Sequence, residues 1–154
     1  YSNYFDLFNQ NISSISFMFK SANSLTNDNV KLSERINIPS KKLRGFEAGR
    51  VGPKDGDDFI GGNFAAAINF SSTLPHFFEE SQNIDFLFFF DVANIWGVDY
   101  DSALDDEGSI RSSTGIALDW FTPIGPLNFS LALPITKKNG DKTETFRFNL
   151  GTSF

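Results

Sequence analysis

The feature that most constrains the fold of this chain is a strict alternation of large apolar residues with small or polar ones over residues 146–154. Phe146 and Phe148 fall on one side of this pattern, and Arg147 and Asn149 fall on the other. Successive side chains of a β-strand point to opposite faces, so a period of two predicts a strand with one apolar face.

The same alternation recurs upstream, which predicts an all-β, antiparallel protein without helices. The further predicted strands are 15–20, 64–72, 84–92, 115–121 and 127–135. Residues 4–9 are predicted to form either another strand or a connecting turn. Pro123–Pro126 and Asn139–Asp141 have the composition of tight turns between neighbouring strands.

Phenylalanine supplies much of the apolar face, with 19 Phe among 154 residues. The longest unbroken apolar run is Phe86 to Phe90, whereas a transmembrane helix needs about 20 mostly apolar residues, so no spanning helix is expected. Tilted strands of about 9–11 residues cross a bilayer in outer-membrane barrels, and the small, mixed polar face is typical of a barrel lumen. A soluble β-sandwich also alternates, so periodicity alone leaves both architectures open.

Composition excludes several kinds of chemistry. The chain has no cysteine and one histidine, His76, which excludes disulfides and cysteine-based metal sites and argues against Ser-His-Asp catalysis. A net charge of -6 argues against nucleic-acid binding. Residues 1–6 lack the pattern of a signal peptide, so we expect a mature chain, a trimmed chain or a fragment.

The connections differ in length and polarity. Residues 97–109 form a long, acidic connection, while 123–126 is short; long loops lie outside and short turns on the periplasmic side in outer-membrane barrels. Residues 73–83 are longer than a usual periplasmic turn, and we have no physical account of that length.

A long segment at about 27–62 does not follow a strand pattern and is rich in glycine, including Gly52, Gly56, Gly61 and Gly62. Long connections of this kind are usually functional or disordered. A phosphate-cradling loop is excluded because GxxxxGK[ST] is missing, but a flexible surface loop is not.

Identity comes from a resemblance. Arg44-Gly45-Phe46, followed by Gly52-Pro53 and Gly61-Gly62-Asn63, resembles the RGF loop of the BamA family of outer-membrane protein assembly factors. Residues 90–96, 115–127 and 146–154 resemble the strands that follow in that family, in the same order. The similarity extends from about residue 30 onward.

The resemblance implies an antiparallel transmembrane β-barrel of the bacterial outer membrane. Residues 1–154 would form a single C-terminal barrel region of about six to eight strands with a lumen-directed RGF loop, whereas a family barrel has about sixteen strands. The N-terminal strands and the POTRA domains that precede the barrel would then be absent. A complete small barrel and self-association through open edges remain alternatives.

In the family, the arginine of the RGF loop contacts acidic residues on the inner wall. Arg44 would be that arginine and Asp91 one partner, because a guanidinium pairs bidentately with a carboxylate. The second acidic position corresponds to the neutral Asn69, so Asp119 is a candidate substitute. Alternatively, Asp91 and Asp119 are solvated lumen residues.

Residues 146–154 resemble the β-signal by which outer-membrane proteins are recognised for assembly. Its residues would be Phe146, Phe148, Gly151 and the terminal aromatic Phe154. A plain lipid-facing girdle is the alternative, and the two roles are compatible. In the family this strand pairs weakly with the first strand, and substrate strands are thought to enter at that seam by edge pairing.

The implied function is the folding and insertion of other outer-membrane proteins. We expect no enzyme activity, no cofactor and no metal. The expected partners are the lipid bilayer, unfolded outer-membrane proteins and other subunits of the assembly complex, without nucleic acid. The alternatives are a TamA-like or two-partner secretion transporter, or a small structural barrel without a transport role.

Overall fold

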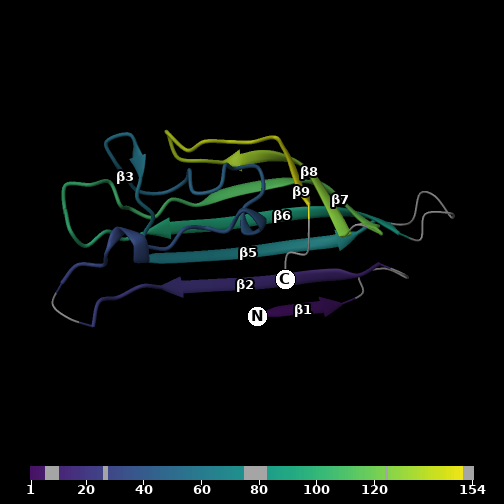
Figure 1. The fold of residues 1–154 in the computed structure, drawn as a ribbon, viewed down its shortest axis with the longest axis horizontal. Coiled ribbons are helices and arrows are strands. Elements are labelled where there is room, and N and C mark those ends of the chain that lie inside the picture. Colours follow the sequence, from purple (N-terminus) through teal and green to yellow (C-terminus); the bar gives the residue numbers. More distant parts are fainter. Residues whose placement is uncertain (6–10, 26–27, 75–82, 124, 151–154) are drawn as a thin grey trace.

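The computed structural model describes residues 1–5, 11–25, 28–74, 83–123 and 125–150. Its main element is a seven-stranded antiparallel sheet in which each strand pairs with the next strand of that sheet along the chain (Figure 1). In spatial order the strands are β1 (Ser2–Phe5), β2 (Ser13–Ser21), β5 (Phe64–Thr73), β6 (Ile84–Trp96), β7 (Arg111–Thr122), β8 (Gly125–Thr136) and β9 (Phe146–Leu150). The all-β prediction is confirmed, and each of its six strands overlaps a strand of the sheet, the predicted 146–154 strand over its described residues Phe146–Leu150.

Some predictions fall partly on residues that the structure does not describe. The proposed 4–9 element overlaps β1, but residues 6–10 lie outside the described residues. So do His76, most of the 73–83 connection, and Gly151 and Phe154 of the proposed β-signal.

The short turn after β7 is tighter than predicted, because Thr122 already pairs with Gly125 at the start of β8. The Thr122 hydroxyl donates to the Gly125 carbonyl over 2.6 Å, which closes the end of the hairpin. The connections 97–110 and 137–145 lie at the opposite end of the sheet, where Lys138 contacts Asp105.

The sheet buries its small residues and exposes its large apolar ones. The inward face carries buried Ala65, Ala67, Ala93, Ala117 and Ala132. Apolar side chains with more than a third of their surface exposed stand on the opposite face; they include Phe17, Ile68, Phe88, Ile116, Leu131 and Phe148. This distribution is the reverse of a water-soluble sheet and matches the outer wall of a membrane barrel.

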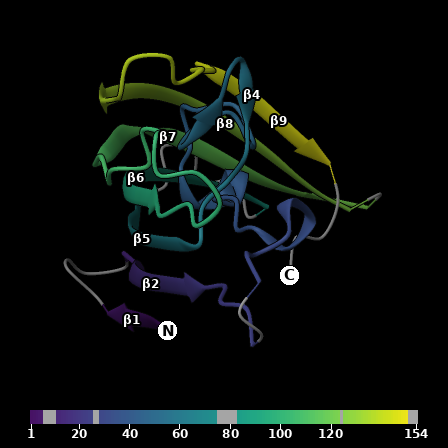
Figure 2. The ribbon, with the colours of Figure 1, turned by 90° about the vertical axis from the view of Figure 1, so that its left-hand side faces the viewer.

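The connection between β2 and β5 lies within the curve of the sheet (Figure 2). It contains the 3-10 turns η1 (Leu32–Glu34) and η2 (Ser40–Lys42) and the small hairpin of β3 (Lys54–Asp55) and β4 (Asp58–Phe59). Its apolar residues Ile38, Leu43, Phe46 and Val51 pack with alanines of β5 and β6 and with Ile95. The alanines leave the space that the loop occupies.

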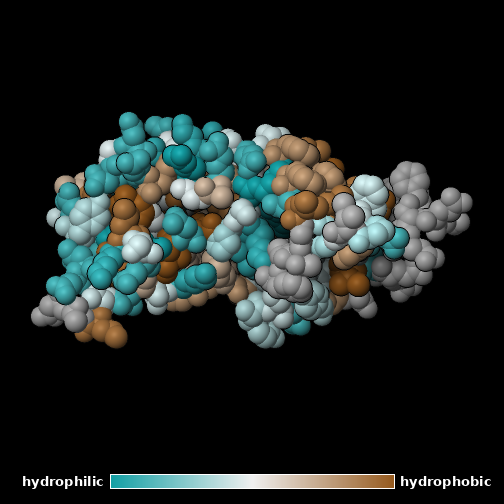
Figure 3. Space-filling model, viewed as in Figure 1, coloured by the Kyte–Doolittle hydropathy of each residue, from teal (hydrophilic) through white to brown (hydrophobic). Residues whose placement is uncertain are grey.

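Three further features complete the architecture. Hydrophilic residues gather over the end of the molecule that carries the long loop and β3 (Figure 3). Among the described residues, none of the helices has the length and apolar character needed to span a membrane. The two edges of the sheet are β1 and β9, each of which is paired on one side only within the described part of the chain.

Candidate functional site

The RGF loop is held to the sheet by an ion pair between Arg44 and Asp91 of β6. Arg44 Nε lies 2.8 Å from Asp91 Oδ2, and Nη2 donates to Oδ1 over 2.8 Å. The backbone N–H of Arg44 also donates to Oδ2 over 3.0 Å, and the guanidinium lies 3.6 Å from the centre of the Phe89 ring. Asp91 is fully buried, so a bidentate partner is what keeps this carboxylate inside the curve of the sheet.

The two other residues proposed as partners of Arg44 have different positions. Asn69 does not bind Arg44 but binds the Asp91 carboxylate beside it. Its Nδ2 donates to Asp91 Oδ1 over 2.8 Å and to the Lys42 carbonyl over 2.9 Å. Asn69 thus adds a neutral donor to the same anion.

The prediction that Asp119 substitutes as a partner of Arg44 is wrong. On β7 the residue opposite Asp91 is Ser113, and Asp119 pairs with Asp85 further along the same two strands. Six residues of strand separate the two positions, which is roughly 20 Å at the rise of a β-strand. Asp119 instead accepts a hydrogen bond from Asn128.

Gly45 and Phe46, the other two residues of the motif, pack the loop against the sheet. Gly45 has a φ of +88°, and a Cβ there would lie 3.2 Å from the Cβ atoms of both Ala132 and Ser113. The Ser113 hydroxyl donates to the Arg44 carbonyl, so the backbone runs against β7 and β8 at this point. Phe46 is buried in the loop core and forms an isolated antiparallel bridge with Thr143.

The loop is packed, which argues against the surface-loop alternative. At Gly52 a Cβ would come within 2.6 Å of Ile95, and at Gly62 within 2.6 Å of the Trp96 carbonyl. These two glycines allow the close approach of the loop backbone to β6.

A second buried ion pair, between Arg111 and Asp141, was missed by the sequence reasoning. Arg111 Nε lies 2.9 Å from Asp141 Oδ2, and both side chains are almost completely buried. The Asp141 carboxylate also accepts from the backbone N–H of Lys138 over 2.7 Å. Asp141 stood out only as a turn residue, and no local pattern connects it to an arginine at the start of β7.

Arg147 of β9 was also missed, although it forms contacts with the RGF loop. Its Nη1 donates to the Ser40 carbonyl over 3.0 Å, and its Nη2 donates to the Phe46 carbonyl over 2.6 Å. The sequence shows only that Arg147 belongs to the inward-facing side of its strand.

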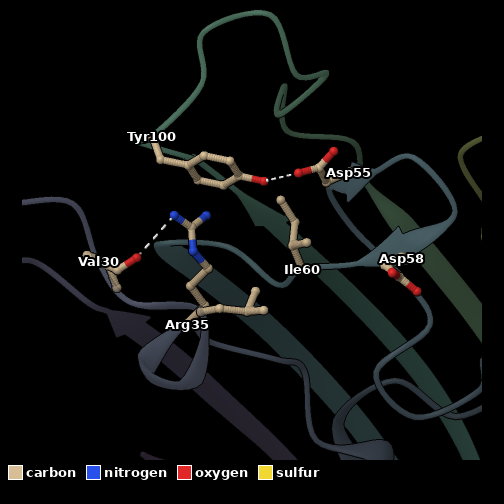
Figure 4. Close-up of a pocket in the computed structure, with 7 residues that line it drawn as sticks. Val30, Arg35, Asp55, Asp58, Ile60 and Tyr100 are labelled. Atoms are coloured by element: carbon tan, nitrogen blue, oxygen red, sulfur yellow. Dashed lines mark hydrogen bonds between the residues drawn. The ribbon is translucent and has the colours of Figure 1, made fainter.

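A fourth arginine, Arg35, lies near the hydrophilic end of the loop beside a cavity of about 530 Å³ (Figure 4). Its Nη2 donates to Asp99 Oδ1 over 2.7 Å, and the Tyr100 ring lies over the guanidinium at 4.8 Å. Burial alone would raise the pKa of Asp99, but hydrogen bonds from the Val30 backbone and from Asn63 outweigh it and lower that pKa. This cluster ties the loop to the 97–110 connection.

A sheet with an apolar convex face and an inward-folded loop held by a buried ion pair defines a segment of an outer-membrane-type β-barrel. The model of the Omp85 superfamily domain matches residues 1–154, and the chain belongs to this superfamily. The predicted resemblance and the predicted outer-membrane barrel class are confirmed.

Several proteins with known names are similar to the chain. The outer membrane protein assembly factor BamA of Neisseria meningitidis serogroup B is 29% identical over 73% of the chain, and that of Neorickettsia risticii is 31% identical over 73%. A SAM50-like protein of Schizosaccharomyces pombe is 30% identical over 92%. The solved structure of Haemophilus ducreyi BamA lacking POTRA domains 1–3 aligns with 96% of the chain at a TM-score of 0.85 and 30% identity.

The chain spans only part of each of these proteins. It covers 17% and 16% of the two BamA sequences, 31% of the SAM50-like protein and 32% of the solved BamA chain.

Proposed function

We propose that this chain is the C-terminal barrel region of an outer-membrane protein assembly factor that folds and inserts other outer-membrane β-barrels. The observation that carries the proposal is the combination of a seated RGF loop with an edge strand, β9, that is paired on one side only among the described residues. An unpaired edge offers a row of N–H and C=O groups to which another strand can add.

The geometry of β9 identifies which groups are offered. The Ala132 N–H donates to the Thr145 carbonyl. Hydrogen-bonded positions alternate along an antiparallel strand, so the N–H and C=O groups of the odd-numbered residues that follow Thr145 point toward β8. The backbone groups of Phe146, Phe148 and Leu150 therefore face the free edge, while their side chains lie on the convex, lipid-facing side. A substrate strand would pair with these three residues.

The setting of the proposed function is the bacterial outer membrane. The convex face contacts lipid, unfolded outer-membrane proteins are the substrates, and other assembly subunits act together with the full-length protein. Further strands of a larger barrel and periplasmic POTRA domains would come from parts of the polypeptide beyond residues 1–154. The work is templating and local thinning of the bilayer, which requires neither an enzyme reaction nor a cofactor.

A TamA-like or two-partner secretion activity is the alternative within the superfamily. The packed loop favours assembly over translocation, because Leu43, Phe46 and Val51 fill the inside of the curve where a translocated chain would pass. A structural barrel without transport is distinguished by the insertion assay below.

The test blocks the free edge of β9 in the full-length protein, reconstituted in vesicles with an unfolded outer-membrane barrel as substrate. Phe148→Pro removes one edge N–H and leaves the bonds toward β8 in place, because proline is compatible with an edge position. Phe148→Ala removes the same ring and keeps the donor, so it is the matched control.

We expect Phe148→Pro to lose most of the insertion of the substrate and Phe148→Ala to keep most of it. Insertion is measured as heat-modifiable migration of the folded substrate. Equal insertion by both variants would refute edge templating at β9, and a wild-type protein that inserts nothing would refute the assembly function itself.

A further inference from the structure

Arg147 connects the edge strand β9 to the RGF loop. Its guanidinium donates to two loop carbonyls, those of Ser40 and Phe46, at 3.0 and 2.6 Å. Glu144 orients the same group, since Nε and Nη2 of Arg147 lie 3.0 and 2.6 Å from Glu144 Oε2. The side chain is only 12% exposed, so these bonds are largely shielded from water.

Within the described residues, the strand that Arg147 belongs to has a short ladder, and backbone bonds to the loop precede it: the Glu144 N–H donates to the Gly45 carbonyl over 3.0 Å, and Phe46 forms a bridge with Thr143. β9 pairs with Leu127–Leu131 of β8, and within the described residues its other edge has no strand partner. β7 and β8, in contrast, pair from Ser112 to the turn at Thr122. A strand with such a short ladder depends more on contacts outside the sheet than a central strand does.

The loop stretch that Arg147 contacts is anchored on its other side by Arg44. Ser40 and Phe46 flank Arg44 closely in sequence, and Arg44 is bound to Asp91 of β6. Residues 40–46 therefore join β6 to β9 across the inside of the curve by side-chain contacts that add to the path through the ladders of β7 and β8, although the same stretch also packs against Ser113 of β7. An open surface hollow of about 550 Å³ lies next to Arg147 and is lined in part by Glu47 and Asn149.

We propose that Arg147 is a positioning residue that couples the seated RGF loop to the edge strand at which substrates pair. The inference rests on the proposed assembly function and adds to it Arg147 and the physical connection from the RGF loop to β9. While Arg44 holds the loop on Asp91, Arg147 holds β9 in place, and unseating the loop frees β9 even though β8 is unchanged.

The first experiment measures hydrogen exchange of the β9 backbone amides by mass spectrometry, in the full-length protein in vesicles. In Arg147→Ala we expect the peptide containing Phe146–Leu150 to exchange about tenfold faster or more, because two charge-assisted hydrogen bonds are lost. Arg147→Lys keeps a cation that reaches one carbonyl but lacks the planar fork, so part of the protection should return. Arg50→Ala is the control, since Arg50 is an exposed cation of the same loop.

The second experiment distinguishes coupling from a local structural effect. Arg44→Ala should also accelerate exchange in β9, although the contacts of Arg44 are with Asp91, Phe89 and Ser113 and not with that strand. If both residues act through residues 40–46, the double variant should exchange little faster than either single variant, because the second change removes a connection that is already broken. Fully additive effects, or wild-type exchange in Arg147→Ala, would overturn the proposal.

Insertion of a substrate barrel by the same variants separates this inference from the proposed function. We expect insertion by Arg147→Ala to fall several-fold, with partial recovery in Arg147→Lys. If the wild type inserts substrate and Arg147→Ala does so equally well despite a mobile β9, Arg147 has no positioning role. If the wild type inserts nothing, the assembly function fails, and the exchange data alone decide whether β9 and the loop are coupled.

Discussion

The concave and convex faces of the same sheet differ in the size and polarity of their side chains. The concave face carries alanine, serine and glycine together with two buried ion pairs, Arg44–Asp91 and Arg111–Asp141, and it is covered by the packed loop. The convex face carries large apolar side chains that no other part of the described chain covers. In water this would be an unstable arrangement, and in a bilayer it is the stable one.

This difference shows which positions tolerate substitution and which require one particular residue. Any large apolar residue of suitable length serves the convex face, because lipid makes no directional contacts. The concave face depends on particular partners, because each buried charge requires an opposite charge in a defined position. Substitutions on the two faces should therefore differ in size and in their dependence on the environment.

The largest effect is expected from Asp91→Ala, which leaves Arg44 without its carboxylate partner. Breaking a buried pair by removing one partner costs about 3–5 kcal/mol. Stability is measured by urea unfolding in vesicles, and loop seating by the rate of proteolysis within residues 40–60. Arg44→Met combined with Asp91→Leu should recover part of the loss, and a double variant less stable than Asp91→Ala would contradict this account.

The next largest effect is expected on the convex face, where the cost of a charged side chain should depend on its depth in the bilayer. Ile116 lies near the middle of β7, and Ile135 lies near the end of β8. Arginine at the bilayer midplane of a barrel costs about 2–4 kcal/mol and about 0–1 kcal/mol near the interface, so Ile116→Arg should destabilise more than Ile135→Arg. The comparison uses urea unfolding in vesicles, and equal costs for the two variants would mean that this face does not contact lipid.

A smaller effect separates packing from backbone strain in the loop. Gly45 and Gly49 both have positive φ, but a Cβ meets neighbours at 3.2 Å only at Gly45 and nothing within 4 Å at Gly49. Both alanine variants carry about 1–2 kcal/mol of left-handed strain, and Gly45→Ala should add about 1 kcal/mol or more from overpacking. Unfolding midpoints measure the difference, which would vanish if the loop were not packed against β7 and β8.

The smallest effect is expected at the exposed pair of Lys138 and Asp105. The hydrogen bond from Lys138 holds the pKa of Asp105 below its usual value. A lowered folded-state pKa gives a contribution that is present above the unfolded pKa and is lost as pH falls through the folded pKa. Asp105→Asn should therefore remove a slight acid dependence below pH 4 and lower stability at neutral pH only slightly, because exposed, salt-screened surface pairs contribute little. A large loss at neutral pH would contradict the exposed position of this pair.

The sequence alone predicted the parts of the fold that depend on the pattern of neighbouring residues. The alternation at 64–72, 84–92 and 127–135 identified the strands and assigned Phe88 and Leu131 to the lipid face, because the period of a strand is a property of neighbouring residues. The contact between Arg44 and Asp91 was expected only through the resemblance to a family motif, and the structure places the two side chains 2.8 Å apart.

Only the tertiary structure decided which inward-facing residues meet. Asp91 and Asp119 look equivalent in the sequence, since both are acidic residues on the small-residue face, but strand register places Asp91 opposite Ser113 and Asp119 opposite Asp85. The pairing of Arg111 with Asp141 and the contacts of Arg147 with the loop likewise depend on how the loop folds back into the curve. Alternation determines the face on which a side chain lies; register and long-range packing determine its partner, because those involve residues far apart in the chain.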